Sequence, residues 1–258
     1  MKRCSSMLLF GMLLFISSCA STGGTGPSSA AMSVKNPLYP FTVMRQGSVE
    51  LQQGHYQAAL KHFEEASRLE PGNATAYNMI GLCELRLGKP AQSIDAFNKA
   101  LALIPSFSDA RNNRGVAYLE LRQYRLAEVD FLAVLADTTY PHRWQVYYNL
   151  GMTYLEMGRL VAAEENLRRA AHAPMPVFYA TLRLAEVQQK QGKLEQAIST
   201  LEAAHVKFPN RPEATLELAK ALILAGKKER AMTYLKEVLS DAPGSPWAAQ
   251  AKQLLKGE

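Results

Sequence analysis

Side chains that could bind a metal or act as nucleophiles are scattered through this 258-residue chain, which has five histidines and three cysteines. His55 and His62 are seven residues apart, but we find no cysteine or carboxylate at a spacing that completes a metal site with them. The GKP and GKKER segments follow predicted helices, whereas a phosphate-binding loop follows a strand. We therefore expect no catalytic residue, no metal and no other cofactor. A function that depends on partners is favoured over an enzyme or a small-molecule-binding protein.

The elements that would position any binding surface are short amphipathic helices, and residues 74–107 show the pattern best. In the second half of this stretch Ile94, Phe97 and Leu101 fall three or four residues apart, which places them on one helical face. Gly88 suits the end of the first helix, because glycine adopts a left-handed backbone at little cost. Pro105 cannot extend the second helix. The stretch therefore predicts a pair of helices.

This helix pair recurs along the chain with a period of 34 residues, as the glycines at 47, 81 and 115 show. The period, with small residues where helices cross and proline after the second helix, resembles the tetratricopeptide repeat (TPR). The resemblance implies an all-α, right-handed α-solenoid of six TPR helix pairs with a C-terminal capping helix. The predicted repeats are residues 40–73, 74–107, 108–143, 144–177, 178–211 and 212–245, followed by the capping helix in residues 246–258.

The third repeat departs from the pattern in two ways. Arg122 stands where most other repeats have a glycine between their two helices. The repeat is also two residues longer, because Gly115 and Gly151 are 36 residues apart and not 34. The extra residues fall in the segment DTTYPHR, residues 137–143.

The first 18 residues are predicted to be a signal peptide. Lys2 and Arg3 precede an apolar run at residues 7–16, which is too short to span a bilayer. The run ends in ISSC, which resembles the lipobox of bacterial lipoproteins, and this implies cleavage before Cys19 and acylation (palmitate) of that cysteine. The alternative is an ordinary secretory signal that releases a soluble periplasmic protein. The resemblance further implies an outer-membrane location, because Ala20 stands where inner-membrane lipoproteins of the enteric type commonly have Asp.

Residues 19–39 are expected to be the acylated cysteine and a flexible tether, because they are rich in Gly, Ser, Thr and Ala. Cleavage would lower the formal net charge from +6 to +4, because it removes Lys2 and Arg3 and leaves 27 basic and 23 acidic residues. No run of basic residues with interleaved aromatics suggests nucleic acid. Cys83 is predicted to be a buried, unreactive thiol on a helix.

The predicted partner-binding surface is a groove along the first helices of the repeats. In TPR folds, positions 2, 5, 9 and 12 of these helices point into the groove, and many of these positions are apolar here. A soluble chain rarely exposes a contiguous apolar strip without a use for it. The alternative is that solenoid curvature or an off-by-one register buries several of them. The predicted groove residues are Phe41, Met44, Leu51, Asn78, Leu82, Leu85, Asn112, Val116, Leu119, Tyr148 and Met152.

A lipobox, a tether, six TPRs and a terminal helix together resemble the pilotin lipoproteins of type IV pilus systems, of the PilF, PilW and Tgl type. The junction of the third and fourth repeats carries the resemblance furthest, with Asp137, Tyr140-Pro141, Arg143 and Asn149-Leu150-Gly151. The resemblance implies a non-enzymatic lipoprotein that helps the outer-membrane secretin to localise and multimerise. Its partner would be the secretin subunit, with no nucleic acid and no small-molecule substrate. The alternative is a general envelope adaptor that docks proteases or peptidoglycan hydrolases onto substrates.

Overall fold

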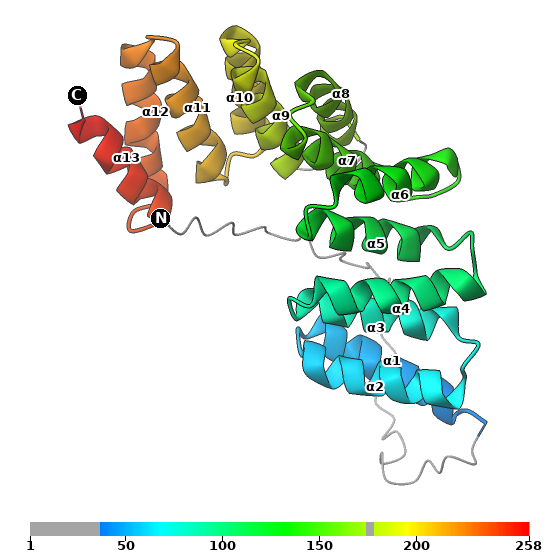
Figure 1. Ribbon diagram of the computed structural model, residues 1–258. Helices are drawn as coiled ribbons and strands as arrows, with labels where there is room; N and C mark the ends of the chain where they lie inside the picture. The colour runs from blue at the N-terminus through cyan, green and yellow to red at the C-terminus, as the bar shows by residue number, and fades with distance from the viewer. Residues whose placement is uncertain (1–36, 174–177, 258) are drawn as a thin grey trace. The chain divides into compact units, whose positions relative to one another are not determined.

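The computed structural model describes residues 37–173 and 178–257. These residues fold into thirteen α-helices without strands (Figure 1). The helix bounds are α1 Tyr39–Gln52, α2 Tyr56–Leu69, α3 Ala74–Arg86, α4 Pro90–Leu103, α5 Ser108–Glu120, α6 Tyr124–Ala136, α7 Arg143–Glu156, α8 Leu160–Ala171, α9 Phe178–Lys190, α10 Leu194–Lys207, α11 Pro212–Leu224, α12 Lys228–Asp241 and α13 Pro246–Lys256. The all-helical fold predicted from the 34-residue period is confirmed, including the final helix at Pro246.

The helix ends follow from the residues that the sequence places there. The Asn73 side chain caps α3 by accepting a hydrogen bond from the backbone N–H of Ala76 at 3.0 Å. Pro90 occupies the first turn of α4, where its missing N–H costs nothing. Gly88, between the two helices, has a φ of +73°. At the equivalent place in the third repeat, Arg122 adopts a φ of +59°, so the turn keeps its shape although the residue is not glycine.

The two helices of each of the first three pairs are held together by one aromatic ring against one glycine. A Cβ atom added to Gly81 would lie 2.6 Å from Cε1 of Phe97, and Gly115 stands in the same relation to Phe131. Both rings are fully buried. Burying a ring of this size contributes about 1.5–3 kcal/mol, so the small residue lets each pair close over its largest core side chain.

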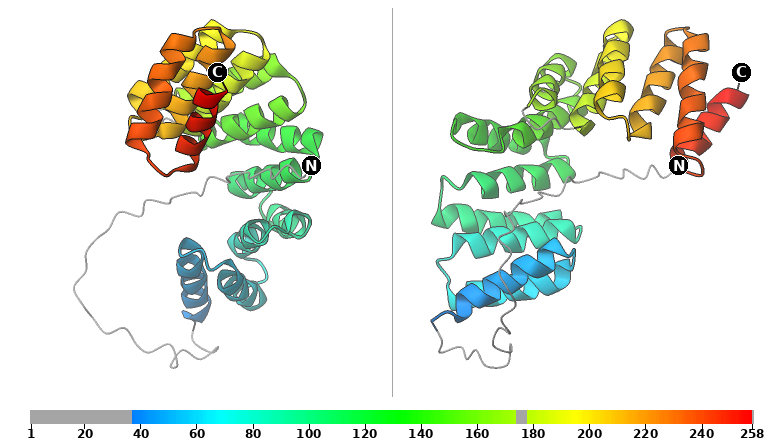
Figure 2. Two further views of the ribbon diagram at one scale, coloured as in Figure 1. Left: turned by 90° about the vertical axis from the view of Figure 1, so that its left-hand side faces the viewer. Right: turned by 180° about the vertical axis from the view of Figure 1, so that it is seen from behind.

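Helices that follow one another in the chain pack side by side through the described residues (Figures 1 and 2). In addition, α3, α5, α7, α9, α11 and α13 form a row in which each helix contacts the next. We call the surface of this row the odd-helix face. The predicted groove positions lie on these helices, and α1 carries the groove positions of the first repeat.

The predicted signal peptide, Cys19 and most of the tether lie outside the described residues. The pattern of contacts between residues divides the chain into two units, Met1–Tyr39 and Pro40–Glu258. Among the described residues, no helix combines the length and the apolar character that crossing a membrane requires.

Candidate functional site

Five of the predicted groove residues are buried in the protein. Asn78 is only 1% exposed, and Leu85, Asn112, Leu119 and Met152 are all below 9%. The expectation that they present their side chains to a partner is wrong. Neighbouring helices of the odd-helix face approach closely enough for these side chains to fill the space between them. The alternative reading, burial by the packing of the solenoid, holds for this part of the groove.

The two buried asparagines take part in side-chain hydrogen bonds that cross from one repeat to the next. Asn113 Nδ2 donates to Asn78 Oδ1 at 3.1 Å, which joins α5 to α3. Asn149 Nδ2 donates to Asn112 Oδ1 at 3.3 Å, which joins α7 to α5. A buried polar group is costly unless it is bonded, so these amides fix the contact between the helices. In this structure Asn78 and Asn112 therefore hold neighbouring repeats together.

The other predicted groove residues keep part of their surface. Met44 and Leu51 are half-buried against the cluster that contains Ile80 and Cys83. Phe41, one turn before Met44 on α1, is 69% exposed. In the first repeat, therefore, Phe41 presents much more surface than the other two.

Three further predicted groove residues are half-buried. Val116 and Tyr148 pack against a core cluster built from α5 to α9, and Leu82 on α3 is half-buried as well. Their capacity to bind a partner stays a prediction.

Cys83 is fully buried, in line with the expected packing role. Burial raises the pKa of its thiol to about 12, and the nearby Glu84 carboxylate adds to this. The thiolate is the reactive form, so Cys83 is protonated and inert at neutral pH.

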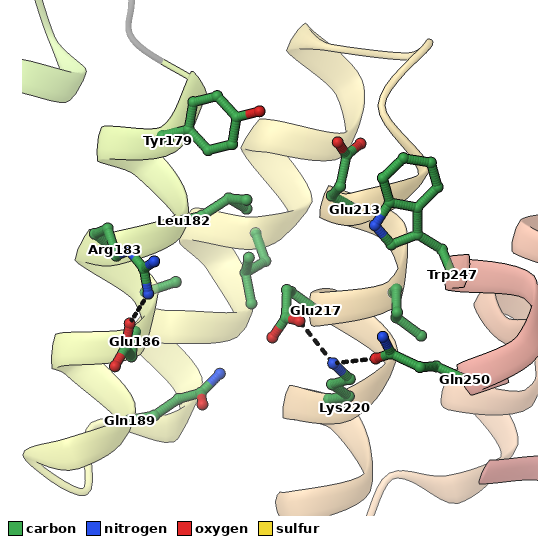
Figure 3. A pocket seen from close by; sticks show the side chains of 13 residues that line it. Tyr179, Leu182, Arg183, Glu186, Gln189, Glu213, Glu217, Lys220, Trp247 and Gln250 are labelled. Carbon is green, nitrogen blue, oxygen red and sulfur yellow. Dashed lines mark hydrogen bonds and ion pairs between the residues drawn. The ribbon is translucent and has the colours of Figure 1, made fainter. Parts of the chain in front are cut away.

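The odd-helix face opens between α9, α11 and α13, where a pocket of about 480 Å³ lies (Figure 3). Its floor is apolar and its walls carry charged, amide and aromatic side chains. The lining residues are Tyr179, Leu182, Arg183, Ala185, Glu186, Gln189, Leu201, Glu213, Leu216, Glu217, Lys220, Trp247 and Gln250.

Most of the charged side chains that line this pocket form ion pairs with one another. Arg183 Nη1 donates to Glu186 Oε2 at 2.7 Å on α9. Lys220 Nζ donates to Glu217 Oε1 at 2.7 Å and to Gln250 Oε1 at 3.1 Å, which ties α11 to α13 (Figure 3). Glu213 forms only a long ion pair, from its Oε1 to Arg211 Nη1 at 3.9 Å, and its Oε2 is buried without a hydrogen-bond partner in the described structure.

None of the predicted groove residues lines this pocket, although the repeat register places several of its lining residues at groove positions. Tyr179, Glu213 and Trp247 are 34 residues apart, and each is the second residue of its helix. Leu182, Leu216 and Gln250 share the fifth position in the same way. Carrying the register one unit further, into the capping helix, would have found Trp247 and Gln250.

The junction between the third and fourth repeats, residues 137–143, is held by its own side chains. Asp137 Oδ1 accepts hydrogen bonds from the backbone N–H and the hydroxyl of Thr139, and its Oδ2 accepts one from Ser108 at the start of α5. The bond from the Thr139 hydroxyl is the main cause that lowers the pKa of Asp137. The carboxylate therefore remains charged over a wider pH range and fixes the turn after α6.

Tyr140 and Arg143 complete the same junction. The buried Tyr140 donates its hydroxyl to Asp109 Oδ1 at 2.8 Å, and burial raises the pKa of that hydroxyl. Arg143 Nη1 donates to the carbonyl oxygens of Leu135 and Asp137 at 2.8 and 2.7 Å, which satisfies the end of α6. The motif that carries the resemblance to pilotins thus sets the connection between two repeats.

No group of three or more His, Cys, Asp or Glu side chains that could hold a metal ion occurs in the described part of the chain. His55 lies at the protein surface, where its Nδ1 contacts Glu50 Oε2 at 2.7 Å. The fold and the odd-helix face together define a helical-repeat protein whose open pocket could bind another molecule.

Comparison with known proteins identifies the repeat. Tetratricopeptide-repeat family models match residues 44–106, 112–176 and 188–255. The chain belongs to the tetratricopeptide-repeat family, whose members mediate protein–protein interactions and are typically scaffolds without enzymatic activity.

Among individual proteins, the chain is 23% identical to the type IV pilus assembly protein PilF of Pseudomonas aeruginosa, over 71% of this chain and 72% of PilF. It is also 23% identical to the CTR9 homolog of Arabidopsis thaliana, but it spans only 22% of that protein. The crystal structure of PilW, described as a type IV pilus biogenesis factor, matches with a TM-score of 0.75 and 21% identity, over 85% of this chain and 99% of PilW. A PilF structure matches with a TM-score of 0.70 and 20% identity, over 85% and 97%. The chain is thus a TPR scaffold related to PilF and similar in fold to PilF and PilW.

Proposed function

We propose that this protein is a pilotin-like lipoprotein that assists the localisation and multimerisation of a type IV pilus secretin in the outer membrane. The observation that carries the proposal is the match to PilF, which extends over most of both chains. The CTR9 homolog is similar over only a fifth of its own length, as expected when repeats alone are shared. The protein would act by binding and positioning its partner, without chemistry of its own.

Membrane attachment is the first part of the proposed function. Acyl chains on Cys19 would hold the repeats at the periplasmic face of the outer membrane. Each buried CH₂ group contributes about 0.8 kcal/mol, so one chain binds reversibly while two or three anchor stably. Residues 20–36 would serve as the tether. Anchoring raises the effective concentration of the binding surface near secretin subunits, so weak contacts become productive.

The first repeat supplies the surface that we propose for the secretin. Phe41 and Val49 are exposed on α1, eight residues apart, so they lie on the same side of the helix. An apolar segment of a secretin subunit could cover these side chains before the ring assembles. The half-buried Met44 and Leu51 pack against the cluster that contains Ile80 and Cys83 and so hold α1 in place.

The direct test is the amount of heat-stable secretin multimer in membranes of cells with and without this protein. We expect the multimer to be lost while secretin monomer persists and shifts to the inner membrane. An unchanged multimer in the outer membrane would overturn the proposal. Co-purification of a protease or peptidoglycan hydrolase in place of the secretin would favour the adaptor function instead.

A matched pair of variants tests the surface. Phe41→Glu places a charge on the exposed face of α1 and is expected to reduce the multimer without unfolding the repeats. Val206→Glu is the control, because Val206 is 78% exposed on α10, away from the proposed surface. Normal multimer in a folded Phe41→Glu variant would exclude this face.

A further inference from the structure

The pocket between α9, α11 and α13 contains one carboxylate that has only a long ion pair and one oxygen without a hydrogen-bond donor. Of the three acidic residues that line it, Glu186 is paired with Arg183 and Glu217 with Lys220. Glu213 Oε2 is buried and accepts no hydrogen bond from any described residue. Its other oxygen, Oε1, forms a long ion pair with Arg211 Nη1 at 3.9 Å, which is beyond hydrogen-bond distance. The helix dipole at the start of α11 favours this charge but leaves Oε2 without a donor.

Aromatic rings stand beside this carboxylate. Figure 3 shows Glu213 next to the indole of Trp247, with Tyr179 across the pocket, while the two ion pairs lie further along it. Trp247 is half-buried and packs against the cluster that contains Leu216 and Leu235, so its ring is held in place. A cation over a Trp face is stabilised by the ring quadrupole, most strongly for Trp among the aromatic side chains.

We propose that this pocket binds an arginine side chain from a segment of another polypeptide. The guanidinium would donate hydrogen bonds to Glu213 and stack on Trp247, and the methylene stem would cover the apolar floor at Leu182 and Leu216. Arginine fits better than lysine, because its planar group both stacks on aromatics and donates in parallel to a carboxylate. An anionic ligand fits poorly, because Arg183 and Lys220 are already paired.

This inference goes beyond the proposed function. It concerns a second surface, on the fifth and sixth repeats and the capping helix, and does not depend on the secretin being the partner. The pocket volume of about 480 Å³ also exceeds what one guanidinium fills, which leaves room for residues on either side of the arginine.

The test is a fluorescence titration of the full chain, purified in detergent, with short capped peptides. The chain has two tryptophans, so a Trp144→Phe background leaves Trp247 as the only reporter. The probes are acetyl-Gly-Arg-Gly-amide and the same peptide with citrulline, which keeps the shape of arginine but has no charge. We expect the arginine peptide to change the Trp247 signal saturably and the citrulline peptide to bind at least about tenfold more weakly.

Two variants locate the interaction. Glu213→Gln is expected to weaken binding of the arginine peptide about tenfold, because it removes the charge of the lining carboxylate that no hydrogen-bonded ion pair neutralises. Glu217→Gln is the matched control in the same pocket, and binding should stay within about twofold, because Glu217 is already paired with Lys220. Circular dichroism and the urea midpoint would show that both variants fold.

Two results would overturn the inference. Equal binding of the arginine and citrulline peptides would exclude charge recognition. Equal weakening by Glu213→Gln and Glu217→Gln would indicate only a diffuse negative potential. A dimer in sedimentation velocity that dissociates on Glu213→Gln would support the inference and identify the other polypeptide as a second copy of this chain. None of these results depends on the secretin assay, so the two proposals can fail separately.

Discussion

The odd-helix face differs between its two halves. On α3 and α5 the ninth and twelfth positions are aliphatic, with Leu82 and Leu85 on one helix and Val116 and Leu119 on the other. On α9 the same positions are Glu186 and Gln189. Aliphatic side chains fill the space between helices, whereas the charged and amide side chains line a pocket. One repeat register therefore produces a closed surface in one half and an open one in the other.

The contrast shows what position in a repeat does and does not determine. It fixes the direction of a side chain, because each helix sits in its pair in the same way. Whether that side chain meets a partner or a neighbouring helix depends on how well the residues around it fill the space. We expect four pairs of substitutions, each with one member in either half, to measure this difference.

The largest difference in stability is expected when the side chain at the twelfth position of a first helix is shortened to alanine. Leu119→Ala should cost about 3 kcal/mol of unfolding free energy, because it leaves a cavity among buried side chains. Gln189→Ala, at the same position of the fifth repeat, should change stability by less than about 0.5 kcal/mol, because Gln189 lines the open pocket. Urea unfolding followed by circular dichroism measures both. Similar losses in the two variants would mean that the faces are equally closed.

The next largest change in stability is expected from substitution at the fifth position of the helices in this row. Asn112→Ala should cost about 1–3 kcal/mol, because Asn149 would lose its acceptor in a partly buried environment. Gln250→Ala, at the fifth position of the capping helix, should stay within about 0.5 kcal/mol, because its bond to Lys220 is exposed. Thermal unfolding of the two variants provides the comparison. A stable Asn112→Ala variant would show that the hydrogen bonds between repeats contribute little.

Substitutions in the turns between helices should change stability by a smaller amount, and the sign of the change should be opposite in the two halves. Arg122→Gly should stabilise the protein by about 1 kcal/mol, because a non-glycine residue with positive φ is strained. Gly226→Arg should destabilise it by about the same amount, since Gly226 has a φ of +73°. The shift of the urea midpoint reports both. No gain from Arg122→Gly would mean that the Arg122 side chain compensates for the strain.

The smallest effect depends on pH. Burial raises the pKa of Glu84 on α3, and the negative charge of Glu64 adds to this. A raised folded-state pKa means that the ionised carboxylate lowers stability above that pKa, and that the penalty disappears as the pH falls below the unfolded value of about 4.3. Glu84→Gln should therefore stabilise the protein at pH 7 by less than about 1 kcal/mol, and should have no effect near pH 4.

Glu217 is the matched control for Glu84, because it lies in the open pocket and pairs with Lys220. Glu217→Gln should lose between about 0 and 1 kcal/mol at pH 7, the usual worth of an exposed ion pair. Opposite signs at pH 7 are the expected outcome of urea unfolding for these two variants. The same sign for both would contradict the assignment of Glu84 to a closed environment.

The fold could be predicted from the sequence almost completely, because each repeat obeys local rules. Gly81 and Phe97 indicate where two helices cross. Gly88 indicates the turn between helices, and Pro90 indicates the start of the next helix. Even the exception at Arg122 was visible as a missing glycine. These features depend on residues close in sequence, where spacing carries most of the information.

The candidate site could be predicted only in part. The register gave the direction of Asn78 and of Glu186 equally well, but the first is buried and the second lines a pocket. The outcome depends on contacts between residues about 34 positions apart, such as Asn78 with Asn113. Trp247 packs against the cluster that contains Leu235, and the same ring also borders the pocket. Sequence spacing alone does not show which gaps neighbouring helices fill.

The most direct test of the contrast is photo-crosslinking in cells from one position in each half. Benzoylphenylalanine would replace Gln250 at the open pocket or Tyr148 on the closed part of the face. We expect an adduct from position 250 whose crosslinked segment contains an arginine by mass spectrometry, which disappears with Glu213→Gln, and no adduct from position 148. If the adduct came from position 148 and none from position 250, the open pocket would not be where this protein binds another polypeptide.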